Sequence, residues 1–390
     1  MSYTSNFKTK SEYIKRQNLS PQNIYLVALD IGYSGVKGMS ANSIFCFPSF
    51  TRVQSGEMIG TPRDTDILYK DETGQIYAVG DFALEGLNAN DTNDSTSTLF
   101  GRNRYFTPSF KILARVGLAM GLQKGEQNGY DGKKPLFLQT GLPPAYRRSD
   151  TRLLVEALAG EHRFSVKIGK EEWKEYKFTL PASNISVIDQ PIGSVYSASK
   201  RNDGTTVATD ESGRSYIDSR VLVVDGGFGT LDTFSVMNRS ISGSNTFNTH
   251  GMKAVFERTA NAIFERHGAD VQVHTLQNML ESGTVKAFNR RTRSSQLIPF
   301  GDILKEKNRA VCNEALDKIE ATYNNLIDYD FLLVTGGTCA SWLNYIRDRY
   351  KGMETLQIIT GNQNDPSLSH IYSNVRGYYM YRALTAIRKE

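Results

Sequence analysis

The sequence has few of the residues that build metal centres, disulfide scaffolds and membrane spans. Its 390 residues include only three cysteines, Cys46, Cys312 and Cys339, and five scattered histidines. This spacing excludes a CxxC redox pair and argues against a zinc site. The apolar runs, such as residues 221–224 and 331–334, are far shorter than the ~20 residues that a spanning helix needs. A disulfide-stabilised miniprotein and a membrane-spanning protein are therefore poor interpretations.

Targeting signals and strong charge are also missing. Residues 1–21 carry basic side chains without the apolar core of a signal peptide, and we interpret them as a flexible arm. We therefore expect a cytoplasmic protein with no membrane partner. The formal net charge of +5, from 46 basic and 41 acidic residues, is too small to indicate nucleic-acid binding by itself. A chain of this length is expected to form two or three domains.

Apolar segments alternate with segments of helical spacing along most of the chain. We expect strands at residues 24–31, 36–47, 135–139, 185–188, 221–224, 231–236 and 331–334, and helices at 110–122, 152–158, 253–267, 302–323, 341–350 and 378–388. Strands that alternate with helices are typical of an α/β fold. Residues 88–97 and 200–220 are polar, and we interpret the second stretch as an exposed excursion or a loop beside a hinge.

Two segments half a chain apart share one plan. VALDIGYSGVKG, residues 27–38, and VVDGGFGTLDTF, residues 223–234, each contain an apolar strand, an aspartate at its end, a glycine-rich turn and a second strand. This internal repeat predicts two similar domains that face each other across a cleft. A third element, LLVTGGT at residues 332–338, places two glycines between a strand and a helix.

These turns suit the binding of a nucleotide phosphate. Glycine allows backbone N–H groups to converge on an anion because no Cβ intervenes. Ser34 and Thr230 add hydroxyl donors, and Lys37 adds a cation. Asp30 and Asp225 are oxygen ligands of the kind that hold Mg²⁺ beside a nucleotide. The two loops would form a phosphate clamp, and the third element could seat a base or ribose; purely structural turns are the alternative.

Other nucleotide-binding motifs do not fit. The sequence has no GxxxxGK[ST] segment, and Asp232 stands where a dinucleotide fingerprint requires a third glycine.

Taken in order, the motifs resemble those of the actin superfamily of ATPases, most closely the bacterial plasmid-segregation actins of the ParM type. DIGYSGVK is similar to the first phosphate loop, VVDGGFGTLD to the second, VIDQPIGSVYSAS to a strand and connecting helix, VTGGT to the adenosine-binding turn, and NVRGYYMYRAL to the final connecting segment. TGLPPAYRRSD followed by LAGEHRFSV resembles a stretch of the ParM-type branch. These matches span nearly the whole chain.

The resemblance implies duplicated actin-like, ribonuclease H-like domains around a nucleotide cleft. Domain I would span residues 22–190, with a smaller subdomain inserted around 50–110. The connecting helix and polar excursion would occupy 191–220, domain II 221–369, and a C-terminal helix, 370–390, would return to domain I.

The resemblance also assigns roles to individual residues. The nucleotide would contact Gly32, Tyr33, Ser34, Gly35 and Lys37 in the first loop, Gly226, Gly227, Phe228, Gly229 and Thr230 in the second, and Gly336, Gly337 and Thr338 in the adenosine turn. Asp30 and Asp225 would hold Mg²⁺ through water. Gln190, Asp225 and Asp232 would be catalytic, with the Gln190 amide orienting the attacking water because it cannot take a proton at neutral pH.

Two departures from the family pattern affect these assignments. Many ParM-type proteins resemble one another in having a glutamate where this chain has Gln190, and Phe228 is bulky for a phosphate loop. A role for Gln190 as a polar cap at a strand end therefore stays open.

The function implied is an ATPase, with GTP as an alternative nucleotide, that polymerises on binding ATP and disassembles after hydrolysis. Its filaments would move plasmid DNA in the bacterial cytoplasm through a DNA-bound adaptor. Two basic clusters, Arg147, Arg148 and Arg152, and Lys286, Arg290, Arg291 and Arg293, could contact phosphate, solvent or neighbouring subunits. Neither cluster has interleaved aromatic residues for base stacking, so we expect no direct sequence-specific DNA binding.

Three other functions remain to be weighed. A small-molecule kinase or phosphohydrolase of the same superfamily would need a carboxylate facing an acceptor and an added pocket, and the sequence identifies neither. A chaperone-like regulator would need a separate peptide-binding domain. A DNA-binding protein with a vestigial nucleotide fold would bind DNA without ATP turnover. The arm and residues 200–220 could contact filament neighbours or a partner, or be solvated insertions.

Overall fold

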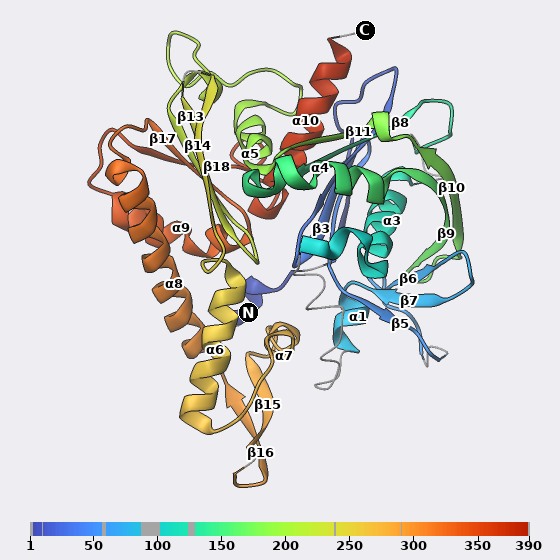
Figure 1. Ribbon diagram of the computed structural model, residues 1–390, viewed down its shortest axis with the longest axis vertical. Helices are drawn as coiled ribbons and strands as arrows, with labels where there is room; N and C mark the ends of the chain where they lie inside the picture. The colour runs from blue at the N-terminus through green and yellow to red at the C-terminus, as the bar shows by residue number, and fades with distance from the viewer. Residues whose placement is uncertain are drawn as a thin grey trace. The chain divides into compact units, whose positions relative to one another are not determined.

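In the computed structural model, the chain forms two compact units (Figure 1). Residues 3–9, 11–56, 60–86, 102–123, 129–237, 239–289 and 291–388 are described. Unit 1 comprises Met1–Lys8 and Thr209–Thr360, and unit 2 comprises Thr9–Ala208 and Gly361–Glu390. The second boundary along the chain thus falls inside the polar stretch of residues 200–220.

Unit 2 is built on a six-stranded sheet with the order β1-β4-β3-β2-β8-β11. Its strands are β1 (Glu12–Lys15), β2 (Tyr25–Ile31), β3 (Gly35–Ser40), β4 (Ser43–Pro48), β8 (Leu136–Leu142) and β11 (Ile185–Asp189). Strand β2 pairs antiparallel with β3 and parallel with β8. Because side chains alternate along a strand, odd-numbered residues of β2 join the core with α3 (Pro108–Leu122), and its even-numbered residues join the core with α10 (Ser373–Ile387).

A second sheet of unit 2 has the order β10-β9-β6-β7-β5. Its strands are β5 (Thr51–Val53), β6 (Ile67–Lys70), β7 (Ile76–Val79), β9 (Gly160–Ile168) and β10 (Lys174–Leu180), with α1 (Asp81–Glu85) packed against β7. Helix α4 (Pro144–Leu158) packs on β8 and β11 of the first sheet. Most of this second sheet lies in sequence regions where no strand was expected.

Helix α5 (Gln190–Ser199) packs on α10 through two glycines. A Cβ placed on Gly377 would lie only 1.6 Å from the carbonyl oxygen of Gly193, so a side chain there would force the helices apart. Beside this crossing, the hydroxyl of Ser194 donates a hydrogen bond of 2.5 Å to Asn374 Oδ1. The crossing therefore fixes the position of α5, which carries Gln190 at its first turn.

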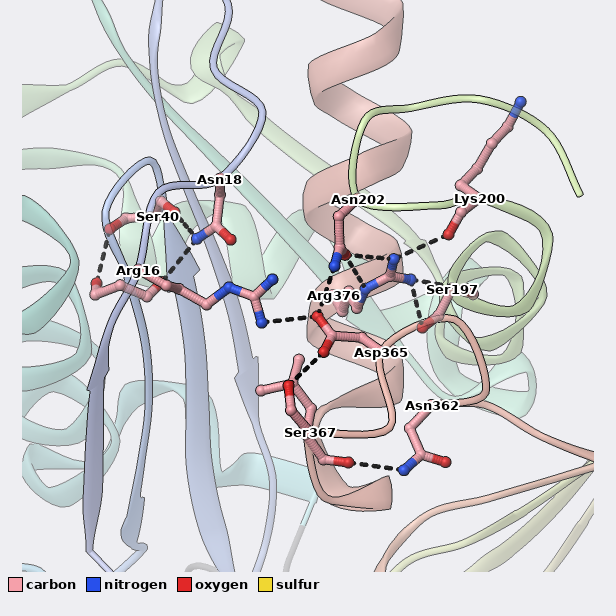
Figure 2. Close-up of polar contacts among 12 residues, drawn as sticks. Arg16, Asn18, Ser40, Ser197, Lys200, Asn202, Asn362, Asp365, Ser367 and Arg376 are labelled. Atoms are coloured by element: carbon pink, nitrogen blue, oxygen red, sulfur yellow. Dashed lines mark hydrogen bonds and ion pairs between the residues drawn. The ribbon is translucent and has the colours of Figure 1, made fainter.

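Polar side chains secure the C-terminal end of the same helix (Figure 2). The buried Arg376 of α10 donates to the backbone carbonyls of Ser197 at 2.7 Å and Lys200 at 2.9 Å. Burial lowers the pKa of Arg376 to about 10. Asn202 bridges Arg376 and Asp365, and Asp365 also forms an ion pair of 2.7 Å with Arg16. A cation at the C-terminal end of a helix is favourable because the carbonyls there carry partial negative charge.

Unit 1 contains a five-stranded sheet with the order β14-β13-β12-β17-β18. Its strands are β12 (Val221–Gly226), β13 (Leu231–Met237), β14 (Ser240–Phe247), β17 (Phe331–Thr335) and β18 (Gln357–Thr360). Helix α9 (Gly337–Tyr350) packs on β12 and β17, and α8 (Gly301–Thr322) packs on α9. Helices α6 (Met252–His267) and α7 (Val273–Asn278) and a hairpin of β15 (Thr284–Asn289) and β16 (Ser294–Pro299) complete the unit.

The structure differs from the sequence expectations in several segments. Residues 36–47, expected as one strand, form β3 and β4, because the polypeptide turns at Ala41 and Asn42. In the expected flexible arm, β1 pairs with β4, and a short 3-10 helix, η1 (Tyr3–Phe7), packs on α8 and α9. The expected polar loop at 88–97 lies outside the described residues. No described helix is both long and apolar enough to cross a membrane.

Candidate functional site

The first candidate loop joins β2 to β3 at Gly32, Tyr33 and Ser34. The N–H of Gly32 donates to the Gly35 carbonyl at 3.1 Å, which closes a tight turn. A Cβ on Gly32 would lie 3.0 Å from the Gly35 oxygen and 3.1 Å from Lys37 Nζ. A side chain there would therefore fill the space beside the lysine, and glycine keeps that space open.

Asp30 and Lys37 are register partners across this hairpin. Asp30 is 5% exposed, and its Oδ2 lies 3.7 Å from Lys37 Nζ. Gln190 Nε2 donates a hydrogen bond of 3.2 Å to Asp30 Oδ1. The carboxylate of the first loop is thus partnered by a cation and an amide, and Gln190 lies beside the proposed metal ligand.

Two neighbours of this loop were not anticipated from the sequence. Arg104 lies 4.5 Å from the centroid of the Tyr33 ring and donates to the Ile31 carbonyl at 2.8 Å. Ser49 donates from its hydroxyl to the Gly32 carbonyl at 2.8 Å. Neither residue belongs to a recognisable motif: Arg104 reaches the loop from a distant part of the sequence, and Ser49 directly follows β4.

Asp189, at the end of β11, is a third missed residue. Its carboxylate is buried beside Gln190 and lies 3.4 Å from Arg147. Burial raises the pKa of Asp189, although Arg147 acts in the opposite direction. Arg147 of the first basic cluster therefore has a structural partner, as does Arg152, which pairs with Glu156. The order VIDQP carried the only signal for Asp189, since it places a carboxylate directly before Gln190.

The second candidate loop joins β12 to β13 over residues 227–230. The Gly227 N–H donates to the Thr230 carbonyl at 2.9 Å, and a Cβ on Gly227 would lie 3.3 Å from the same oxygen. Phe228 is a buried residue with its ring near Phe256, so its side chain belongs to the core.

The carboxylates of Asp225 and Asp232 come from directly paired positions of β12 and β13. Asp225 is 6% exposed and Asp232 is 3% exposed. Burial raises the pKa of Asp232 to about 6, although hydrogen bonds from the hydroxyls of Thr246 and Thr230, at 2.5 and 2.8 Å, act to lower it. The Thr230 hydroxyl, expected to meet phosphate, therefore donates to Asp232. Thr246 of β14 carries no motif and was missed.

The third element begins helix α9 beside the second loop, within unit 1. Gly336 has φ +83°, and a Cβ there would lie 2.5 Å from Asp225 Oδ1 and 2.4 Å from the Gly226 oxygen. Only glycine combines this left-handed backbone with so close an approach. Gly337 opens α9, and the Thr338 hydroxyl donates to the Gly227 carbonyl at 2.6 Å. The third element thus supports the second loop.

The residues described form no group of three or more His, Cys, Asp and Glu side chains that could hold a metal ion. Such a cage is unnecessary for Mg²⁺, which is held by one or two carboxylates together with water and phosphate oxygens. Asp30 of unit 2 and Asp225 of unit 1 are each carboxylates of the kind that such a site uses. The predicted site residues stay predictions; the structure brings together Asp30, Lys37 and Gln190 in unit 2, and Asp225, Asp232 and Gly336 in unit 1.

Comparisons with known proteins bear on the fold. Residues 28–193 match the family model of the N-terminal domain of actin-like proteins. A structure of a 15-stranded ParM filament from Clostridium botulinum is similar with a TM-score of 0.67 and 18% identity, covering 92% of this chain and 99% of that one. A non-polymerisable quadruple mutant of pCBH ParM has a TM-score of 0.68 and 18% identity, covering 93% and 100%.

The archaeal actin homologue Ta0583 in complex with ADP is also similar, with a TM-score of 0.60 and 15% identity, covering 93% of this chain and 100% of that one. No curated protein matches the sequence significantly. At these identities the structural matches establish the fold. They confirm the predicted actin-like α/β fold class and, with the family match, the resemblance to the actin superfamily.

Proposed function

We propose that the protein is an ATPase that assembles into filaments, because residues 28–193 match the family model of the N-terminal domain of actin-like proteins and the chain has the actin-like fold. The observation that carries the proposal is the repeated hairpin. Asp30 and Asp225 each end a buried strand and each adjoin a glycine turn. The ADP complex of Ta0583 supports nucleotide binding by this fold.

We assign the triphosphate to these two turns. In the first, Lys37 Nζ and the N–H groups around Gly35 would neutralise and bind phosphate oxygens. In the second, the backbone N–H of Gly229 would do the same, whereas the Gly227 N–H already donates to the Thr230 carbonyl. The glycines of residues 336–337 would contact the nucleoside. Mg²⁺, held through water by Asp30 and Asp225, would neutralise phosphate charge during hydrolysis. ATP is the proposed nucleotide, with GTP as the alternative.

We assign the positioning of the attacking water to Gln190. Its Nε2 donates to Asp30, which leaves the amide oxygen to accept a hydrogen bond from water. An amide orients a water molecule without removing its proton, as glutamine does in other nucleotide hydrolases. Asp225 would help to place the same water and the metal, and Asp232 would support it from the opposite position on β13.

We propose that assembly follows the nucleotide state. If ATP stabilises the polymerising conformation over ADP by about 2–4 kcal/mol, the critical concentration differs by roughly 30- to 1,000-fold. The ParM filament of C. botulinum supports a polymer as the functional state. We further propose that the filament moves plasmid DNA in the bacterial cytoplasm through a DNA-bound adaptor protein.

Light scattering and phosphate release, followed together, test the proposal. Purified protein is mixed with Mg²⁺ and ATP, GTP, ADP or no nucleotide. Scattering should rise with the triphosphate and decay as phosphate appears. Phosphate release without scattering would instead favour a small-molecule kinase or phosphohydrolase, and release that increases with an added sugar or acid would identify its acceptor class. If neither scattering nor phosphate release is observed, both functions are contradicted.

A further inference from the structure

The chain passes between the two units three times. Met1–Lys8 and Thr209–Thr360 belong to unit 1, and the other residues belong to unit 2. The chain therefore passes from one unit to the other after Lys8, after Ala208 and after Thr360. Because each passage is a covalent restraint, the positions of the three passages decide which movements of the units are possible.

The second and third passages lie together at the C-terminal end of α5. The Val207 N–H donates to the Ser199 carbonyl at 2.9 Å, and the Ser197 hydroxyl donates to the Gly361 carbonyl at 2.7 Å. Val207 and Gly361 each lie within two residues of a passage. Figure 2 shows the polar contacts around this end of the helix. Two passages at one place form a hinge, because they allow rotation while they hold the units together there.

The first passage lies in another segment, residues 3–9 and 11–15, which we call the N-terminal strap. Its 3-10 helix, η1, packs on α8 and α9 of unit 1. Thr4 is 1% exposed, and its hydroxyl donates to the Leu280 carbonyl at 2.5 Å. Lys8 forms an ion pair of 3.1 Å with Glu281. Buried and polar contacts therefore dock the beginning of the strap on unit 1.

The rest of the strap is fixed on unit 2 beside the first candidate loop. A Cβ on Gly35 would lie 2.8 Å from Thr9 Cγ2, so Thr9 packs directly on the backbone at the end of this loop. The Ser11 N–H donates to Asp81 Oδ2 at 3.1 Å, and the four residues of β1 pair with β4. Lys8 and Ser11 are thus docked on different units although they are three residues apart. A chain of three residues spans at most about 11 Å, so the linker between the docked ends is short.

The strap and the hinge restrain unit 2 at different places. Gln190, in the first turn of α5, donates to Asp30 beside the first candidate loop, whereas the hinge lies at the other end of this helix. The helix has 10 residues and is therefore about 15 Å long. A restraint at this distance from an axis limits the rotation about that axis.

We infer that the N-terminal strap limits the separation of the two units and thereby slows the exchange of the bound nucleotide, an inference that rests on the proposed nucleotide site. A nucleotide whose phosphates contact both glycine turns leaves when the units separate. The short linker keeps η1 at a high effective concentration beside its docking site, so undocking is rare. Release of ADP then depends on the undocking of η1, which is a point of control outside the nucleotide site.

Lengthening the strap tests the restraint without removing its contacts. An insertion of about twelve glycine and serine residues between Lys8 and Thr9 adds about 20 Å of reach, and both ends keep their docking sites. Dissociation of a fluorescent ADP analogue should become at least about ten-fold faster. The same insertion after Gly352, where a Cβ would meet nothing, is the matched control and should leave the rate unchanged. Native dissociation from the strap variant would overturn the inference.

Undocking η1 tests the same restraint with the linker intact. Thr4→Arg places a long charged side chain at a buried position, so η1 cannot keep its packing on α8 and α9. ADP dissociation should accelerate as much as in the insertion variant. Asn6→Arg, at an exposed position of the same short helix, is the matched control and should behave as the native protein does. A lower thermal midpoint of Thr4→Arg with native ADP dissociation would mean that η1 only stabilises unit 1, and the inference would fail.

Distances between the units test the restraint with no nucleotide present. The three native cysteines are buried, so spin labels can be attached selectively at Lys177→Cys on β10 of unit 2 and Ile241→Cys on β14 of unit 1. Both positions are exposed. Electron paramagnetic resonance should give a broader distribution of label distances for the strap insertion than for the native chain or the control insertion. An unchanged distribution would contradict the inference.

The outcomes separate this inference from the proposed function. A broader distribution of distances in a chain that binds neither ATP nor ADP would support the restraint on the units and contradict the proposed nucleotide site. ATP-dependent assembly with a native distribution in the insertion variant would support the function and overturn the inference. A broader distribution without faster release, in a chain that binds ADP, would show that the strap does not control nucleotide exchange.

Discussion

The hairpins of residues 27–38 and 223–234 have the same sequence plan but different surroundings. In the first, Asp30 faces the cation of Lys37 and the amide of Gln190. In the second, Asp225 faces a second buried carboxylate, Asp232, and the backbone of Gly336 approaches it closely. One loop thus neutralises its carboxylate within the protein, whereas the other places two acidic groups together. Under the proposed function, we expect the first loop to bind phosphate and the pair of buried carboxylates beside the second loop to bind the metal ion.

The largest effect should come from removing the carboxylate that lies opposite a second buried carboxylate. Asp225→Asn is expected to lower Mg²⁺-dependent phosphate release about 1,000-fold, or about 4 kcal/mol, because metal and water lose a ligand. Asp218→Asn is the control, since that carboxylate lies in the same unit and pairs with Arg239 at the surface. Phosphate release at the native rate with the same Mg²⁺ would show that the second loop has another role.

The paired carboxylates also predict a pH-dependent stability. The pKa of Asp232 is about 6 in the folded protein, above the usual value near 4, so the folded state binds this proton more tightly than the unfolded state. The free energy of unfolding should therefore increase as pH falls from about 7 to about 4, by up to about 3 kcal/mol. Urea titrations across this range measure the change.

Asp232→Asn should flatten this dependence, because the amide does not titrate. Ser34→Ala, in the turn of the first hairpin, changes no titratable group and should leave the dependence between pH 4 and 7 intact. A native slope in Asp232→Asn would assign the titration to another group.

Substitution of Gln190 tests whether the residue beside the first loop takes part in hydrolysis. Gln190→Ala should slow phosphate release by about 10- to 100-fold while ATP-dependent assembly persists and filaments last longer, since only the orientation of water is lost. Gln75→Ala, at an exposed glutamine of the same unit, is the control. Unchanged turnover would leave Gln190 as a polar cap at the end of β11 and remove it from the reaction.

The sequence predicted the fold and the positions of the two glycine-rich loops better than it predicted the residues that contact those loops. Buried strands such as 221–224 and the aspartates at strand ends follow from local pattern, so the duplicated α/β architecture was accessible. Arg104 reaches the first loop from a distant segment, whereas Ser49 and Thr246 lie 17 and 14 residues from the groups that they contact. Single residues of this kind have no sequence signature in either case. The second sheet of unit 2 was missed although it contains the local hairpins β6–β7 and β9–β10; only the pairing of β6 with β9 joins segments far apart in the chain.

The smallest effects are expected from removing the two hydroxyl groups, of Ser34 and Thr230, that occupy equivalent turns, and the two substitutions should differ in their effects. Ser34 Oγ forms no hydrogen bond with another described residue, whereas the Thr230 hydroxyl donates to Asp232. Ser34→Ala should therefore raise the KM for ATP about five-fold, near 1 kcal/mol, without changing the thermal midpoint. Thr230→Val should lower stability by about 1 kcal/mol with little change in KM. Steady-state kinetics and calorimetry measure the two effects. The difference is expected because the Thr230 hydroxyl, already bound to a carboxylate, has no hydrogen left to donate to phosphate. Equal effects of the two substitutions in both assays would mean that the two turns are equivalent.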